Sequence, residues 1–279
     1  MTRNSGGGWP RANVVDLAAP AVTQQWRRAR PPFVLINMAM TADGKIATAN
    51  RAVSSFGSRR DVAHLYELRA TVDAVMCGAR TAAAGEVHLD AGGPRYQRQR
   101  LKRGLAEFNL RVVVSGSGSL PATLPLFQKR FSPIIVLTTR RAGRRGLRRL
   151  AAAADEVVIC GERHLDLAAA LRWLTARWGV RRLLCEGGGE LNAAMFKAGL
   201  VDELHLTICP LVFGGQEAPT IASGEGAKVL ADATRLELQR CRRVGDELFC
   251  VFAVRPRKVS EAGDCPAPAR RLSSRARKQ

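Results

Sequence analysis

Residues 182–197 have the sequence RLLCEGGGELNAAMFK. The apolar run that ends at Cys185 is typical of a strand, and the segment from Glu190 to Lys197 is typical of a helix. Three glycines between a strand and a helix let the backbone approach a phosphate group closely, and the N–H groups at the start of the helix favour negative charge. A plain tight turn is the alternative. The position of the glycines between strand and helix favours a nucleotide site.

Further apolar runs predict strands that are buried on both faces of a sheet. They lie at residues 33–40, 72–77, 111–114, 134–138, 156–160 and 181–185. Helices are predicted at residues 58–70, 142–153 and 166–178. This alternation is typical of an α/β fold with a mostly parallel sheet flanked by helices. Near the end of the chain, residues 235–241 and 247–254 predict an antiparallel hairpin at the edge of this sheet.

Composition and charge bound the class of protein. The chain has 279 residues, of which 46% are hydrophobic and 24% charged, and no apolar run approaches the roughly 20 residues of a membrane span. The N-terminus lacks the apolar region of a secretory signal, so we expect a soluble, cytoplasmic protein without membrane attachment.

The formal net charge is +20, and half of this excess lies in the two ends of the chain. We expect residues 1–30 to form a flexible N-terminal extension, residues 31–255 one domain, and residues 256–279 a disordered basic tail. Aromatic residues make up only 5% of the chain. The charge is therefore better explained by solubility and attraction of anionic metabolites than by nucleic-acid binding.

Cysteine and histidine spacing predicts no metal site. The seven cysteines contain no C-x-x-C pair, and most lie in apolar runs, which indicates buried, reduced thiols. The four histidines show no H-E-x-x-H or other paired metal-binding spacing. The histidine–glutamate and P-C-x-x-C elements of a zinc deaminase are absent from the sequence.

Two polar features lie near the first predicted strand and helix. Residues 41–45, TADGK, follow the first strand and predict either a ligand contact or a surface turn. In the helix that follows, Ser58 and Asp61 resemble a capping box. Arg69 shares one face of this helix with apolar residues, so its guanidinium requires an anion, either a buried carboxylate or a substrate phosphate.

Residues 85–110 show no clear periodicity and are rich in arginine and lysine. They predict either a solvated basic loop or a rim for an anionic substrate.

Several motifs together resemble one family. They are residues 39–47 (AMTADGKIA), 68–78 (LRATVDAVMCG), 186–189 (EGGG), 199–204 (GLVDEL) and 213–226, which contains FGG, AP and GEG. From about residue 32 to residue 255 the chain resembles the pyrimidine reductases of riboflavin biosynthesis, whose fold is dihydrofolate-reductase-like.

The resemblance implies NADPH-dependent reduction of the ribosylamino side chain of a phosphorylated aminopyrimidine to a ribitylamino chain. The substrate is either the deaminated uracil or the diaminopyrimidine form. Such a hydride transfer requires no nucleophile and no metal, because it depends on positioning of the two reacting carbons. The resemblance also implies a homodimer and a separate deaminase in the pathway.

Carried over by position, the resemblance implies two sets of contacts. The residues expected to contact substrate are Asn37, Ser54 or Ser55, Arg69, Leu89 and Glu186, with Arg69 as the partner of the phosphate. The residues expected to contact the cofactor are Ala39, Thr81, Ser115, Gly188, Gly189, Glu190, Leu191, Asn192, Ala193 and Ala194. Residues 138–141, TTRR, follow a buried strand, and Thr139 and Arg140 are candidates for the 2′-phosphate of NADPH. A basic helix start is the alternative there.

The chain departs from the family at residues 85–88, GEVH. The aspartate that the family places before the leucine falls at Gly85, so its cofactor contact is lost or Glu86 replaces it. Two alternatives follow. One is a reductase of the same fold that acts on another pteridine, folate or pyrimidine. The other is an inactive domain that binds nucleic acid or an acidic partner through the tail at residues 256–279.

Overall fold

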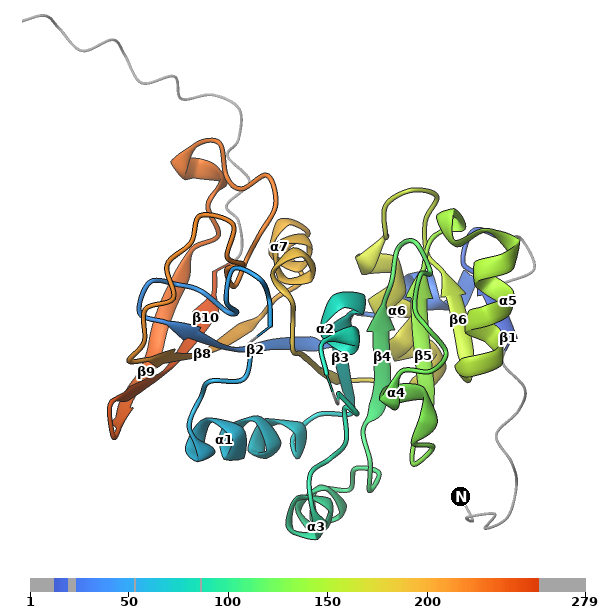
Figure 1. The fold of residues 1–279 in the computed structure, drawn as a ribbon. Coiled ribbons are helices and arrows are strands. Elements are labelled where there is room, and N and C mark those ends of the chain that lie inside the picture. The colour runs from blue at the N-terminus through green and yellow to red at the C-terminus, as the bar shows by residue number, and fades with distance from the viewer. Residues whose placement is uncertain (1–12, 20–23, 53, 86, 256–279) are drawn as a thin grey trace, which may run out of the picture.

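One ten-stranded sheet runs through the molecule (Figure 1). The computed structural model describes residues 13–19, 24–52, 54–85 and 87–255. In spatial order the strands are β1 (Asn13–Asp16), β6 (Glu156–Ile159), β5 (Ile134–Thr138), β4 (Leu110–Val114), β3 (Ala74–Gly78), β7 (Arg182–Cys185), β2 (Phe33–Thr41), β8 (Glu203–Cys209), β10 (Glu247–Val254) and β9 (Leu236–Val244). All neighbours from β1 to β8 are parallel, and β10 and β9 add an antiparallel edge.

Helices cover both faces of the sheet and bury two apolar clusters. The cluster on one face includes side chains from α1 (Arg59–Arg69), α2 (Ala79–Ala83), α4 (Pro125–Gln128) and α5 (Gly143–Ala153). The cluster on the other face includes side chains from η1 (Gln24–Arg28), α6 (Leu167–Trp178) and α7 (Gly189–Lys197). Short helices η2 (Arg140–Ala142) and η3 (Leu230–Asp232) lie in connections. Because both faces are packed, the ends of the parallel strands are where polar groups gather.

The architecture confirms the predicted α/β fold, with its mostly parallel sheet, flanking helices and C-terminal hairpin. The hairpin turns at Gly245 and Asp246, and Val244 pairs with Glu247. One central strand, β8, was not predicted from the sequence. Its alternation of glutamate, histidine and threonine with leucine and isoleucine hides a strand that is nonetheless largely buried.

Part of the segment at residues 1–30, predicted to be a flexible extension, forms regular structure. Residues 13–16 form β1, which pairs in parallel with β6 at the edge of the sheet. Trp26 in η1 is buried in the core beside α6. The folded unit therefore begins before residue 31. Residues 1–12 and 256–279 lie outside the described residues.

The segment at residues 85–110, expected to be an aperiodic basic loop, contains the helix α3 (Pro94–Lys102). Within it Arg100 is fully buried and donates to the carbonyl oxygens of Arg69, Val72 and Ala106 at 2.6–2.8 Å. Burial lowers the pKa of Arg100 to about 10. This arginine thus belongs neither to a solvated loop nor to a substrate rim; it fixes the end of α1 against β3.

The start of α1 confirms Ser58 as its N-cap, because the hydroxyl accepts from the N–H groups of Arg60 and Asp61. In a capping box the backbone N–H of the N-cap residue donates to a side chain three residues later, but here its acceptor lies elsewhere in the chain. The N–H of Ser58 donates to Oε1 of Glu247 at 2.8 Å, and Asp61 instead accepts a hydrogen bond from Thr207. The capping-box assignment of Asp61 was therefore wrong. A carboxylate distant in sequence fills that place and ties α1 to β10.

Five of the six cysteines in the described part of the chain are buried free thiols, and Cys241 is exposed. Within the same residues, no helix is both long enough and apolar enough to cross a membrane. Nor do three or more histidine, cysteine or acidic side chains gather there as a metal-binding group.

Candidate active site at the strand ends

The carboxyl ends of β3, β4, β5 and β7 meet at one edge of the sheet. Their register is continuous, since Gly78 pairs with Val114, Val114 with Leu137, and Met76 with Cys185. The segments that leave this edge carry most of the predicted cofactor residues, among them Thr81, Ser115, Thr139 and the glycines after Cys185. The structure therefore brings together groups that lie over 100 residues apart in sequence.

The glycine turn after β7 is anchored on β3 and α2. The N–H of Gly78 donates to the carbonyl oxygen of Gly187 at 2.8 Å, and the N–H of Gly188 donates to the hydroxyl of Thr81 at 3.1 Å. Gly187 has a φ of +74°, and a Cβ there would lie 2.7 Å from the sulfur of Met38. A side chain at this position would be both strained and obstructed.

Gly189, the first residue of α7, is packed equally closely against its neighbours. A Cβ at Gly189 would collide with the carbonyl oxygen of Thr220 and the hydroxyl of Ser223. The N-cap, Gly188, provides no side-chain cap. The first N–H groups of a helix lack acceptors within the helix, so an uncapped N-terminus at a strand edge suits an anionic group.

Residues 190–194, all predicted to contact the cofactor, divide into three groups on α7. Glu190 is exposed and pairs with Arg80 at 2.7 Å. Leu191 and Asn192 face the interior, where the amide of Asn192 donates to the carbonyl oxygen of Ile221 at 2.8 Å. Ala193 is half-buried and Ala194 is exposed. The helix start, rather than its second turn, is thus the part that faces the edge.

Arg69 meets a carboxylate, one of the two alternatives that the sequence left open for its anion. Its Nε and Nη2 donate to the two oxygens of Glu186 at 2.6 and 2.7 Å, and its Nη1 donates to the carbonyl oxygen of Asp90 at 2.8 Å. Burial alone would lower the pKa of Arg69, but the charge and hydrogen bonds of Glu186 raise it above its ordinary value. The pair fixes Glu186 next to the glycine turn.

Leu89 lies in the segment that Arg69 holds. Its φ is +54°, in the left-handed region that side chains other than glycine rarely adopt, and its side chain is fully buried. The leucine side chain therefore packs in the apolar cluster and is not available to a ligand. Strained backbone of this kind concentrates at functional sites.

Two predicted site residues hold buried polar atoms without a hydrogen-bond partner among the described residues. They are Oδ1 of Asn37, on β2, and the hydroxyl of Ser115, directly after β4. Both residues are at least nine-tenths buried. Because buried polar groups are nearly always satisfied in a working protein, these two atoms suit hydrogen bonds to a bound molecule.

The two arginines at residues 140 and 141 differ in their partners: the first is held by acidic side chains of the protein, and the second is free to bind a ligand. Arg140 binds Asp16 at 2.6 Å and Glu162 at 2.7 Å. Arg141 has no ion pair among the described residues, and with Arg163 and His164 it lines a cavity of about 430 Å³. Sequence reasoning missed Arg163 and His164. Their signal was available, since they directly follow a predicted strand, just as Thr139 and Arg140 do.

The TADGK segment at residues 41–45 is a structural turn. Asp43 accepts from the hydroxyl of Thr41 at 2.5 Å and from the N–H groups of Phe213 and Gly214 at 3.2 and 2.7 Å. These bonds, led by that from Thr41, lower the pKa of Asp43. The turn thus holds the loop that follows β8. Of the other expected contacts, Ala39 is half-buried on β2, and Ser54 and Ser55 are exposed in the segment before α1.

Comparison with known proteins agrees with this arrangement of an α/β sheet with its polar groups at the strand ends. The family model described as RibD C-terminal domain matches residues 32–250, and the chain belongs to this family. It is 35% identical over 224 residues to the 2,5-diamino-6-ribosylamino-4(3H)-pyrimidinone 5′-phosphate reductase of Methanothermobacter thermautotrophicus, covering 80% of this chain and 99% of that protein.

Solved structures share the fold. A pyrimidine reductase-like protein from Corynebacterium diphtheriae superposes with a TM-score of 0.68 at 22% identity, covering 80% of this chain and 92% of that one. RibD of Acinetobacter baumannii gives a TM-score of 0.64 at 21% identity. The alignment covers 81% of this chain but 58% of that longer one.

Proposed function

We propose that this protein is the NADPH-dependent pyrimidine reductase of riboflavin biosynthesis. Its substrate is a phosphorylated ribosylaminopyrimidine, and its product carries a ribitylamino chain. The observation that carries the proposal is the glycine turn and uncapped start of α7, set at the sheet edge of a chain 35% identical to a reductase of this name. NADPH, when bound, supplies a hydride to C1 of the open-chain imine form of the sugar.

The residues at the strand ends fit such a cofactor. The glycines let the backbone pack closely against its neighbours and leave the N-terminus of α7 without a side-chain cap, where a pyrophosphate would bind as at other dinucleotide sites. The unpartnered hydroxyl of Ser115 lies after the neighbouring strand β4, where it would donate to the cofactor. Thr81 contributes by fixing Gly188, and not only by direct contact. The chain's task is to hold the two reacting carbons close together and to exclude water.

Selectivity for NADPH over NADH rests on Arg141, Arg163 and His164. These three side chains line one cavity beyond the ends of β5 and β6, and a 2′-phosphate is the group of NADPH that a guanidinium pair recognises. Arg140, the residue first assigned to this contact, has both its acidic partners within the protein. Its role is to brace the segment that carries Arg141.

On the substrate side, Glu186 and Asn37 are the groups that contact the pyrimidine and its sugar. Arg69 orients Glu186, and three of its five N–H groups are used within the protein. The remaining two are what it would offer to the substrate phosphate. Ser54, Ser55 and the backbone at Leu89 complete the proposed substrate contacts.

The protein is proposed to act as a homodimer, with the deaminase of the pathway on a separate protein. The edge strand β9 has exposed leucines at Leu236 and Leu238, which suit contact with a second copy.

A reductase of the same fold with another substrate is the second candidate, and Gly85 favours it. Its φ of +106° is a conformation that an aspartate would adopt only under strain. The family's aspartate therefore has no simple counterpart at this point. Glu86, the proposed replacement, lies outside the described residues.

The test is NADPH oxidation with three substrates: the deaminated pyrimidine phosphate, the non-deaminated pyrimidine phosphate, and dihydrofolate. Turnover of either pyrimidine supports the proposal and shows whether reduction precedes deamination. Turnover of dihydrofolate alone, or NADPH binding without turnover of any of the three, would assign the chain to the second candidate.

A further inference from the structure

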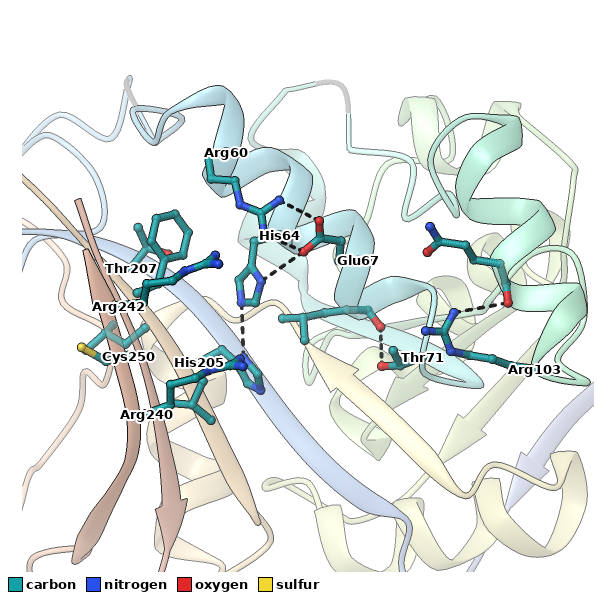
Figure 2. A pocket seen from close by; sticks show the side chains of 15 residues that line it. Arg60, His64, Glu67, Thr71, Arg103, His205, Thr207, Arg240, Arg242 and Cys250 are labelled. Atoms are coloured by element: carbon teal, nitrogen blue, oxygen red, sulfur yellow. Dashed lines mark hydrogen bonds and ion pairs between the residues drawn. The ribbon is translucent and has the colours of Figure 1, made fainter. Parts of the chain in front are cut away.

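A second polar cavity, of about 400 Å³, lies away from the strand-end edge. It opens between α1, α3 and the antiparallel strands β8, β10 and β9, and Figure 2 shows its lining. None of the residues assigned above to substrate or cofactor lines it. The proposed reductase reaction therefore leaves this cavity unexplained.

Its lining is strongly cationic. Arg60, Arg103, Arg240 and Arg242 line the cavity, and Glu67 is the one carboxylate that the described residues contribute to its lining. That carboxylate is already paired, because Arg60 donates to both of its oxygens at 2.7 and 3.0 Å. No acidic side chain among the described residues lies within ion-pair distance of the other three arginines. A concave surface of one sign concentrates counter-ions of the opposite charge.

Two neutral histidines form the inner wall. Nε2 of His64 lies 3.3 Å from Nδ1 of His205, and Figure 2 shows the two rings facing one another from α1 and β8. Burial, with the charge of nearby arginines including Arg240, lowers the pKa of each to about 4. Glu67 and Glu203 approach the outer nitrogens at 3.8 and 3.1 Å. Nε2 of His205 nonetheless makes no hydrogen bond to any described residue.

Arginines without acidic partners, beside two neutral imidazoles, favour a ligand that carries negative charge. We propose that this cavity is a second binding site for a small molecule that carries a phosphate or pyrophosphate group. Arg240 and Arg242 bind the anion as charge-assisted donors, and the His64–His205 pair forms the inner wall beside it. This second site is separate from the reductase site, so the proposal does not depend on which substrate the reductase site reduces.

The strand register keeps this face apart from the proposed dimer surface. Arg240 and Arg242 pair with Val251 and Phe249, whereas Leu238 pairs with Phe252. The register shifts between Val251 and Phe252, so Leu238 and the arginines, although an even number of residues apart, pair with opposite faces of β10 and lie on opposite faces of β9. A second copy that covers the leucines therefore leaves the cavity open.

Isothermal titration of the full-length protein with inorganic pyrophosphate tests the proposal. Arg240→Gln with Arg242→Gln should weaken binding by at least about tenfold, because two charge-assisted contacts are lost. The control, Arg145→Gln with Arg148→Gln, removes the same charge from the exposed face of α5 and should change the affinity by less than about twofold. Equal affinities in the two variants, or no saturable binding, would overturn the proposal.

Histidine side-chain NMR on the unmodified protein locates the bound anion without any variant. Pyrophosphate in the cavity should shift the signals of His64 and His205 and raise their pKa. Binding that leaves both signals unmoved would place the anion elsewhere, for instance at α7, and overturn the proposal. A third result would also overturn the proposal: the unmodified protein does not bind pyrophosphate, and sedimentation shows that the Arg240/Arg242 variant differs from it in oligomeric state. The cavity would then belong to a contact between copies.

Discussion

The two ends of the sheet use polar residues in different ways. In the parallel part, β3, β4, β5 and β7 are apolar over nearly all their buried length, and the polar groups gather where the strands end. In the antiparallel part, polar side chains lie on a sheet face beneath α1. Glu247 binds Ser58, Thr207 binds Asp61, and His205 contacts His64.

The difference follows from what covers each face. Helices cover both sides of the parallel strands, so a ligand approaches most readily at the strand ends. The face beneath α1 is only partly covered, so polar side chains there are tolerated where they pair with one another. A site at the strand ends can be expected from the topology alone. A site on a sheet face can be found only from the structure.

The largest expected effect is at the parallel end. Glu186→Gln leaves the buried guanidinium of Arg69 without its carboxylate and should lower the free energy of unfolding by about 3–5 kcal/mol. The matched control is Glu190→Gln, four residues further along, which breaks the exposed pair with Arg80 and should cost less than about 1 kcal/mol. Urea denaturation measures both. Equal losses would show that Arg69 is not held as described.

The antiparallel end should be the source of a pH dependence. The folded pKa values of His64 and His205, about 4, lie below the unfolded value near 6.5. As the pH falls below 6.5, the unfolded chain takes up protons that the folded protein does not, so stability is lost between about pH 6.5 and 4. Between pH 7.5 and 5 the loss is about 2 kcal/mol for each histidine.

The control for that pH dependence is the double variant His64→Gln with His205→Gln, since the remaining titratable groups stay in place. Urea midpoints at pH 7.5 and 5 should differ less in the variant than in the parent protein. The same difference in both proteins would mean that the histidines titrate normally and that the polar face is solvated.

The affinity for NADPH tests whether the glycine turn at the parallel end of the sheet binds the cofactor. Gly189→Ala introduces a methyl group against Thr220 and Ser223, which should displace the start of α7 and weaken NADPH binding by about 1–3 kcal/mol. Gly93→Ala is the control, because its φ is −69° and nothing lies near its Cβ position. Fluorescence titration with NADPH separates the two. Unchanged affinity in Gly189→Ala would remove α7 from the site.

The smallest expected effect is a difference in KM for NADPH between variants of two adjacent arginines. Arg141→Ala should raise KM for NADPH about tenfold, with little change for NADH, because one phosphate contact is lost. Arg140→Ala breaks the ion pairs with Asp16 and Glu162 and should affect the two cofactors alike. If Arg140→Ala is instead the variant that discriminates between them, the assignment of the 2′-phosphate to Arg141 is wrong.

Much of the fold could be predicted because its strands are continuous apolar runs. β5 was predicted at its observed bounds, and α1, α5, α6 and α7 were predicted to within one residue. Two of the elements that were missed, β8 and α3, have mixed composition. β8 alternates polar and apolar residues because one of its faces carries the polar side chains beneath α1. The helix α3 was hidden by its charge, since Arg100, which holds it in place, is buried and donates from Nε and Nη1 to backbone carbonyls.

The site could be predicted only in part, because spacing along a strand does not show what a side chain contacts. Gly188, Thr81 and Ser115 reach the strand edge as expected. For Arg69 the sequence left carboxylate and phosphate open, and only the position of Glu186 decides between them. Arg140 looked available until β1 brought Asp16 to it, and β1 lies in a segment that composition assigned to a flexible extension.

Hydrogen–deuterium exchange with and without NADPH tests the division of the molecule most directly. Slower exchange is expected in peptides that cover residues 186–194, 115–118 and 139–141, with no change at residues 203–209 and 236–251. Protection of the second set, with none in the first, would place the cofactor on the polar face beneath α1 and contradict the assignment of the reductase site to the strand ends.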